Sequence, residues 1–520
     1  MGLSGQASPE AALDGRRGDL FETSAVDPFI RLELAVSRCY RSTSRMTAIQ
    51  RRTAVLEPFS ARSMTTASKF RCCQSRTLVR FGTEWRIYIR LEKSLMKRNS
   101  LWIALLSSLI TICATLLLMN FATGEKKIER QLERRYSIDD PQFVRSMSSL
   151  LGPPLVAGNR IKVLVNGDQI FPAMLVAIRG AQRSITFETY IYWSESIGKE
   201  FADALGERAR AGVKVHVLLD WIGSVKMEQR YLDEMKNAGV AIERYHEPHW
   251  SHLARLNNRT HRKVLVIDGH IGFTGGVGIA DQWRGDARDP TQWRDTHFRV
   301  EGPVVAQMQG VFMDNWIKAR GKVLHDELYF PRLEPRGEMV AQMFSSSPSG
   351  GSESMQLMYM MAITSARSTI YLSNSYFVPD RLTTAALVAA AKRGVKIRIV
   401  TPGEHIDTEI VRKASRSGWG DLLQAGIEIA EFAPTMYHCK VLVVDALFVS
   451  VGSTNFDNRS FRLNDEANLN VLDAAFAKQQ IEIFEADWRH SRPVTYSDWL
   501  HRPWQDKLLE RLAALLETQL

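Results

Sequence analysis

The sequence predicts an α/β fold made of two homologous lobes that follow an N-terminal transmembrane helix. The lobes are predicted by the octapeptides HRKVLVID (261–268) and HCKVLVVD (438–445), which are nearly identical, and by the segments around them, which repeat in the same order. The helix is predicted by residues 101–121, an uncharged and mostly apolar run long enough to cross a bilayer. The 520 residues carry a net charge of +10, which suits an anionic partner, and their five cysteines exclude a disulfide scaffold.

The segment before the apolar run differs from the rest of the chain. Residues 1–95 are rich in Arg and Ser and show no sustained apolar period. We expect an extension that is disordered, or one that precedes the native start at Met96. Residues 96–124 are predicted to be a retained transmembrane anchor, with a cleaved signal peptide and a buried helix as the alternatives. Basic residues nearly balance across the run, so its orientation stays open.

A connector (125–158) is expected to lead into the repeat. Helix, glycine and alternating strand follow one another in both halves, as in RAGVKVHVLLD (210–220) and RGVKIRIVTPG (393–403). This order is typical of α/β units with buried strands. We therefore expect a first lobe over 159–335 and a second over 336–490, packed as a pseudo-dimer.

Two further segments flank this pattern. The first lobe has an insertion near 246–258, which is predicted to be a lid, a lipid-contacting lip or an ordinary surface loop. Residues 491–520 are predicted to form a helical tail, in which five leucines recur on one helical face: Leu508, Leu509, Leu512, Leu515 and Leu516. We expect this tail to pack against the domain, with a position on a membrane surface as the alternative.

Each octapeptide places two polar groups on one side of a strand. Alternate strand residues share a face, so His261 and Lys263 point the same way, as do His438 and Lys440. A buried Lys beside a His is costly unless it meets an anion. One copy alone could be an exposed pair at a sheet edge, but two copies inside a repeat favour one anion site built by both.

A glycine-rich turn follows each strand, GGVG (275–278) in the first half and GSTN (452–455) in the second. We expect Gly275 and Gly276 to let the backbone approach a ligand closely. Ser453 and Asn455 are expected to add hydrogen-bond donors at the equivalent turn.

These features together resemble the phospholipase D superfamily, whose signature is His, any residue, Lys, four residues and Asp, twice per chain. The resemblance extends over about 159–490. The segments GGVGIADQW (275–283), WRDTHFRVEGPVV (293–305) and GSTNFDNRSFRLNDEANL (452–469) are similar to the bacterial cardiolipin synthase branch. Gly278 departs from the general pattern, which has Asn there, and this puts one phosphate contact from the first lobe in doubt.

The resemblance implies catalysis through a phospho-histidine intermediate. His261 would attack the phosphorus of a phosphodiester, and His438 would protonate the departing alcohol. The non-bridging oxygens would be held by three side chains: Lys263, Lys440 and Asn455. No metal or other cofactor is implied, because the lysines supply the positive charge.

In this family an acidic residue downstream of each motif fixes the tautomer of a catalytic histidine. We expect Asp295 to orient His261 and Glu466 to orient His438, because the two acids occupy similar places in the two lobes.

The residues that close the octapeptides, Asp268 and Asp445, count as members of the catalytic motif in descriptions of the family. Each stands five residues after the Lys, an odd number of steps along a strand, so it faces away from the His. We therefore expect both to have a structural role at the far end of the strand.

The resemblance implies a phosphatidyltransferase of the bacterial inner membrane that makes cardiolipin. Its phospholipid substrates would be phosphatidylglycerol or phosphatidylethanolamine. Hydrolysis of phospholipids by the same site is the first alternative. A nuclease is less expected, because an anchor fits it poorly, and nucleic acid is not an expected partner. A non-catalytic lipid-binding scaffold would have no need of two intact motifs.

Overall fold

The computed structural model describes residues 90, 100–116, 118–119, 128, 130–247, 257–348, 354–517 and 519. The chain divides into two compact units, 1–97 and 98–520, and the fold below is that of the second. The N-terminal extension therefore lies almost wholly outside the described residues, and so does the tip of the insertion, 248–256.

Residues 100–116 are helical, and nearly all of their side chains are exposed. Residues 118 and 119 of the predicted span (101–121) are also helical, whereas residues 117, 120 and 121 lie outside the described residues. Within the part of the chain that is described, no helix combines the length and the hydropathy that a bilayer crossing requires.

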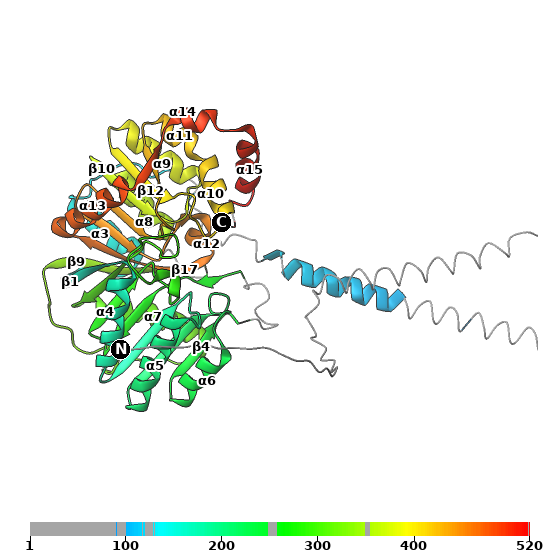
Figure 1. Cartoon of the computed structure of the whole chain (residues 1–520), viewed down its shortest axis with the longest axis vertical. Helices are drawn as coiled ribbons and strands as arrows, with labels where there is room; N and C mark the ends of the chain where they lie inside the picture. Colours follow the sequence, from blue (N-terminus) through cyan, green and yellow to red (C-terminus); the bar gives the residue numbers. More distant parts are fainter. Residues whose placement is uncertain are drawn as a thin grey trace, which may run out of the picture. The chain divides into compact units, whose positions relative to one another are not determined.

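One large mixed sheet passes through both halves of the unit (Figure 1). The strands of the first half are β1 (Val156–Val165), β2 (Ser184–Thr189), β3 (Lys214–Asp220), β4 (Ala241–Tyr245), β5 (Arg259–Thr260), β6 (Val264–Ile267), β7 (Ile271–Gly275) and β8 (Thr296–Glu301). Those of the second half are β9 (Met339–Ser346), β10 (Thr369–Asn374), β11 (Phe377–Val378), β12 (Lys396–Pro402), β13 (Glu428–Phe432), β14 (Lys440–Val444), β15 (Phe448–Gly452), β16 (Phe456–Asp457), β17 (Asn464–Leu472) and β18 (Ser491–Val494). The sheet order is β18-β13-β12-β10-β14-β15-β17-β9-β1-β8-β7-β6-β2-β3-β4, with β5 beside β17, while β11 and β16 pair separately.

The two halves pair their strands in the same pattern. In the first half β4, β3 and β2 are parallel, and β6, β7, β8 and β1 continue antiparallel. In the second half β13, β12 and β10 are parallel, and β14, β15, β17 and β9 continue antiparallel. β1 and β9 pair with each other and join the halves into one sheet. The predicted α/β class is confirmed.

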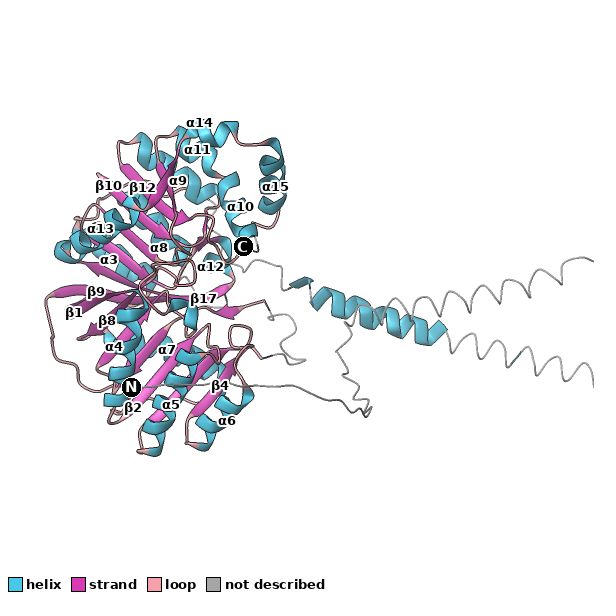
Figure 2. Cartoon of the chain, viewed as in Figure 1, coloured by secondary structure: helices cyan, strands magenta, loops and turns pink. Residues whose placement is uncertain are grey.

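Helices cover both faces of the sheet (Figure 2). They are α3 (Pro141–Leu151), α4 (Asn166–Gly180), α5 (Ser196–Arg210), α6 (Gln229–Asn237), α7 (Val305–Arg320), α8 (Met355–Ser365), α9 (Arg381–Lys392), α10 (Glu409–Ser417), α11 (Trp419–Gln424), α12 (Asn458–Arg462), α13 (Ala474–Arg489), α14 (Tyr496–His501) and α15 (Trp504–Ala514), with a short 3-10 turn, η2 (Asp281–Trp283). The motif strand β6 shows how both faces become buried. Val264 and Val266 face a core shared by both halves under α7 and α13, and Leu265 and Ile267 face the first half's own core under α4, α5 and α6.

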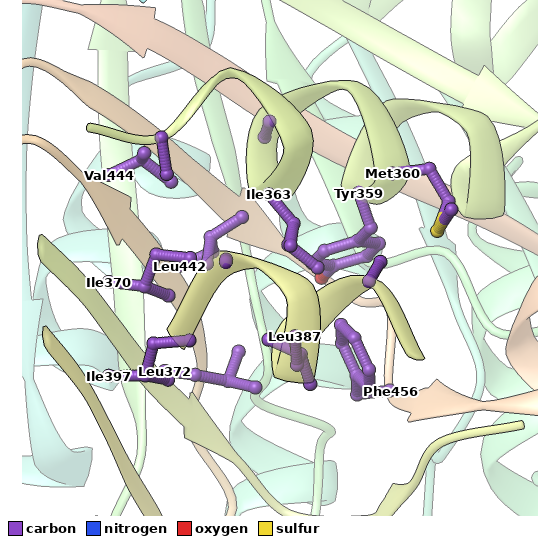
Figure 3. Packing of buried hydrophobic residues seen from close by; sticks show 14 of the residues in the cluster. Tyr359, Met360, Ile363, Ile370, Leu372, Leu387, Ile397, Leu442, Val444 and Phe456 are labelled. Carbon is purple, nitrogen blue, oxygen red and sulfur yellow. The ribbon is translucent and has the colours of Figure 1, made fainter. Parts of the chain in front are cut away.

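The second half has its own core under α3, α8, α9 and α11. Figure 3 shows Tyr359 and Ile363 of α8 and Leu387 of α9 packed against Leu372 of β10 and Leu442 of β14. The sequence of α8, MQLMYMMAITS, is apolar almost all round, which explains why this helix is buried on every side.

Both ends of the repeat differ from the predicted boundaries. β1 begins at Val156, inside the predicted connector, and β18 adds an edge strand to the sheet from within the predicted tail. α15 packs against α10 (Figure 1). It makes this contact through Glu510 and Ala513, which are buried, whereas the leucine face that we expected to pack inward is exposed.

Candidate active site

Each motif begins where the two halves run side by side. β5 pairs with the start of β17, and the backbone N–H of His261 donates to the carbonyl of Asp465 at 2.9 Å. In the equivalent contact the N–H of His438 donates to the carbonyl of Arg294 at 2.7 Å. Each histidine is therefore held beside a strand of the opposite half. His261 lies at the start of β17, and His438 lies beside the residues just before β8.

The carboxylates that hold the two histidines also come from the opposite halves. Nδ1 of His261 lies 3.0 Å from both carboxylate oxygens of Glu466, and Nδ1 of His438 lies 2.7 Å from Oδ2 of Asp295. Our expectation that Asp295 orients His261 and that Glu466 orients His438 is wrong. The acids are equivalent along the chain, but the backbone contacts between halves bring each one to the other motif. An Nδ1–H that donates to a carboxylate leaves Nε2 of a neutral ring with its lone pair.

The two carboxylates receive different supporting donors. The hydroxyl of Ser453 donates to Oε2 of Glu466 at 2.5 Å. On Asp295, the indole N–H of Trp283 donates to Oδ2 at 3.0 Å, and the backbone N–H of Thr296 donates to Oδ1 at 2.8 Å. Both carboxylates are fully buried, so these bonds replace the water that they lose on folding.

Gly275 and Gly276 of the first turn do not line the pocket, although Gly278 of the same turn does. A Cβ on Gly276 would lie 2.3 Å from Oδ1 of Asp295, and one on Gly275 would lie 2.6 Å from the carbonyl of Thr296. Gly276 is equivalent by strand register to Ser453. We expected these two glycines to approach a ligand, but Gly276 makes room for the carboxylate of Asp295, and Gly275 makes room for Thr296 and His297.

Both motif lysines are buried beside the histidines. Nζ of Lys263 donates to the carbonyl of His261 at 2.7 Å. Nζ of Lys440 donates to the hydroxyl of Ser375 at 2.6 Å, and that hydroxyl donates to Oδ1 of Asn455 at 2.8 Å. The amide nitrogen of Asn455 is then the part of this side chain that can donate to a ligand.

Burial sets the charge of the site. It lowers the pKa of His261 to about 4 and of His438 to about 3, and it lowers the pKa of Lys263 to about 7. Burial would raise the pKa of Asp295 and Glu466, but the facing imidazoles and the lysines hold both below their ordinary values. The two histidines are thus neutral at pH 7. A phosphodiester would bring negative charge, which favours the charged lysine and a proton on one imidazole.

The residues that close the motifs lie at the other ends of β6 and β14. The carboxylate of Asp268 accepts the backbone N–H groups of residues 182–184 at 2.7–3.2 Å. That of Asp445 accepts those of residues 367–369 at 2.7–3.0 Å. Neither residue lines the pocket that contains the histidines. These contacts support a structural role, because each Asp ties its motif strand to the start of the neighbouring strand.

Both histidines open onto one pocket of about 450 Å³, which is within the usual range for small-ligand sites. Lys263 and Asn455 line it as well, while Lys440 is not among the lining residues. Aromatic rings surround the imidazoles: Tyr190 is centred 5.2 Å from His261, and Trp283 and Trp293 are centred 5.3 and 5.4 Å from His438. Further lining residues are Trp193, Arg259, Gly278, Tyr376, Asp407, Arg459 and Gln519.

A second buried layer supports the first motif. The hydroxyl of Thr260, the residue before His261, donates to Oε1 of Glu188, and Asn315 donates to the same oxygen at 2.7 Å. Burial raises the pKa of Glu188 to about 7 although Arg262 is close by.

Several of these residues were not found from the sequence. Trp283 and Trp293 lie within the segments that carry the family resemblance, and this was their one signal. Arg259 lies on β5 two residues before His261, and Arg459 lies on α12 within the resembling segment 452–469. Ser375 follows β10, and no spacing in the sequence connects it to the motifs.

Comparisons with the sequences of known proteins agree on one family. The profile of the family described as "Cardiolipin synthase, PLD-like domain" matches residues 174–284 and 359–488, which contain the two motifs. Cardiolipin synthase A of Pseudomonas syringae is 34% identical over 356 residues, which is 68% of this chain and 74% of that relative. Cardiolipin synthase of Geobacillus thermodenitrificans is 34% identical over 366 residues, 70% of this chain and 73% of the relative. The crystal structure of phosphatidylserine synthase from Haemophilus influenzae shares the fold, with a TM-score of 0.57 at 13% identity over 73% of this chain and 100% of that one.

Proposed function

The chain belongs to the family of cardiolipin synthases with phospholipase D-like domains, and we propose that it is a phosphatidyltransferase that works through a phospho-histidine. One observation carries this proposal. Two histidines, each bound through Nδ1 to a buried carboxylate, open onto the same pocket with a buried lysine beside each. Such a site can attack a phosphodiester on one side and protonate its leaving group on the other.

In the first proposed step Nε2 of His261 attacks the phosphorus of the donor lipid. The N–P bond forms as the P–O bond to the head-group alcohol breaks, and protonated His438 gives its proton to the departing oxygen. Lys263 and Asn455, which line the pocket, stabilise the non-bridging oxygens, where negative charge grows in the transition state, and the charge of Lys440, whose Nζ lies 3.2 Å from Nε2 of His438, adds to this stabilisation. We assign His261 as the nucleophile because this is the usual order of the motifs in the family.

In the second step the hydroxyl of an acceptor lipid attacks the phosphorus. His438, now neutral, takes the hydroxyl proton, and the N–P bond breaks to release His261. Water would give hydrolysis by the same path, so transfer requires that the acceptor exclude water from the pocket. The aromatic rings around His438 are suited to this exclusion.

The finer assignments rest on the names of the relatives and on the sequence. We propose phosphatidylglycerol as donor and acceptor, with phosphatidylethanolamine as an alternative donor. The proposed location is the bacterial inner membrane, with residues 101–121 as a single-span anchor. We also infer that the two halves are homologous lobes packed as a pseudo-dimer, which their matching strand order supports.

The test is to reconstitute the full chain in vesicles that contain labelled phosphatidylglycerol and to separate the products. Transfer predicts cardiolipin and glycerol, whereas phosphatidic acid alone would identify a hydrolase and overturn the proposal. His261→Ala should abolish both products. The matched control is His270→Ala, since His270 is an exposed histidine in the turn at the far end of the same strand.

A further inference from the structure

The outer face of α15 combines apolar exposure with a fixed orientation. Trp504 is 69% exposed, Leu508 49% and Leu512 53%, and the helical period places these three side chains along one stripe. Leu515, the C-cap residue of α15, is 77% exposed and continues the stripe. Leu509 and Leu516, each 45% exposed, widen the stripe. Large apolar side chains exposed side by side on one helical face are candidates for a binding site.

The opposite side of the helix is held by polar contacts. Glu510 is 2% exposed, and its carboxylate accepts from Arg416 of α10 at 3.4 Å and from Arg502 at 2.6 Å. Ala513 packs with Val411 and Ala414 of α10. Burial of the leucines would require the helix to be rotated about its axis so that they face α10. The ion pairs of Glu510 with Arg416 and Arg502 hold the helix in the opposite rotation, so the leucines point outward.

The same helix is connected to the mouth of the pocket. Gln519, which follows α15, lines the pocket together with Arg459, whose guanidinium donates to the carbonyl of Gln519 at 3.1 Å. Val411 of α10 also lines the pocket while it packs against Ala513. Two residues that line the pocket, Val411 and Arg459, thus contact α15 and the segment that follows it.

The charges beside the stripe fit an anionic partner. Arg511 follows Trp504 by two helical turns and is exposed, and Lys507 lies one turn before Arg511. Long basic side chains at the edge of an apolar stripe can reach lipid head groups while the leucines lie between acyl chains.

We propose that this face of α15 binds the surface of an anionic phospholipid bilayer and so holds the mouth of the active-site pocket at the membrane. The proposal rests on the proposed function, in which both substrates are bilayer lipids. A second copy of this chain is a weaker occupant. An isologous dimer through this face would bring the basic side chains at its edge, Lys507 and Arg511, close to those of the other copy.

The first experiment locates the helix in the reconstituted full chain. An environment-sensitive fluorescent amino acid is placed at position 512, and in a separate protein at position 176. Val176 is a 69%-exposed apolar residue that lines a different hollow, beside Asp268 at the far end of the first motif strand. Quenchers on the lipid acyl chains should quench the probe at 512 at least twofold more than the probe at 176. Equal quenching would overturn the proposal.

The second experiment separates docking from catalysis. The variant Leu508→Glu/Leu512→Glu should turn over phosphatidylglycerol in vesicles at least tenfold more slowly than the wild type, while its rate on a monomeric short-chain phosphatidylglycerol stays within twofold. Val176→Glu should change neither rate. Circular dichroism checks that each variant is folded.

Three outcomes would contradict this inference. Loss of activity on the short-chain lipid as well would mean that the helix acts on the pocket itself, and unchanged vesicle activity would mean that the face does not bind membrane. A change in oligomeric state by light scattering would identify a second copy as the occupant. A wild type that makes no cardiolipin while the probe at 512 is still quenched would overturn the proposed function and leave the docking intact.

Discussion

The crossed pairing of acids and histidines makes a prediction that distinguishes the two halves of the site. In the wild type, Nδ1 of His261 lies 3.0 Å from the carboxylate of Glu466. Glu466→Gln keeps the size of this side chain but removes its negative charge. A charge-assisted hydrogen bond contributes about 1.5–3 kcal/mol, which corresponds to about 10- to 150-fold in rate. The hydroxyl of Ser453 also donates to this carboxylate. If the new amide turned its NH₂ toward His261, the wrong tautomer would deepen the loss to about 10⁴-fold.

The assay uses a phosphatidic acid ester of p-nitrophenol, whose leaving group departs without being protonated. Adduct formation with this donor does not need a general acid. His438→Ala should therefore form the covalent adduct and accumulate it, and His261→Ala should form none. Because Asp295 holds His438, Asp295→Asn should behave like His438→Ala, whereas Glu466→Gln should form the adduct slowly with either donor. Alkaline quenching preserves a phospho-histidine for counting.

Comparing the acid variants with the histidine variants tests the pairing of Glu466 with His261 and of Asp295 with His438. The test holds whichever histidine is the nucleophile. Each acid variant must resemble the variant of the histidine that it contacts. If Asp295→Asn lost adduct formation in the way that His261→Ala does, the crossed arrangement would be wrong.

Three further predictions concern the surroundings of the site. Asp445→Asn should lower the melting temperature, at a cost of about 1–3 kcal/mol from weakened backbone contacts, but leave the kcat of the folded enzyme unchanged; a fall in kcat at unchanged stability would show a catalytic role. Gly276→Ala should reduce kcat at least tenfold, because its Cβ would meet Asp295 at 2.3 Å, while Gly310→Ala, where a Cβ meets nothing within 4 Å, serves as the control and should be neutral. Burial raises the pKa of Glu188 to about 7. The neutral carboxyl therefore contributes to the free energy of unfolding at low pH, and this contribution, up to about 3 kcal/mol, is lost as the pH rises through about 7. Glu188→Gln should therefore gain stability relative to the wild type between pH 5 and pH 8 in urea titrations, and a difference that does not change with pH would falsify this account.

Much of the fold followed from the sequence because local patterns define it. The runs VLVI and VLVV are buried strands in the structure, as their β-branched composition requires. The repeated order of helix, glycine and strand predicted an α/β class, and the sheet confirms it. The direction of the leucines on α15 was not predictable, because it depends on an ion pair between Glu510 and Arg416 of a distant helix.

The chemistry of the site divides in the same way. Strand alternation and the doubled motif, which are local properties, identified the four His and Lys side chains, and the family resemblance indicated both acids. It could not assign Asp295 to His438, because that contact spans 143 residues and depends on how one half's backbone meets the other's. It also could not show that Gly276 makes room for Asp295. The sequence by itself determined which groups can do the chemistry. The tertiary structure decided which group serves which, because hydrogen bonds between distant segments form only when both halves have folded around one pocket.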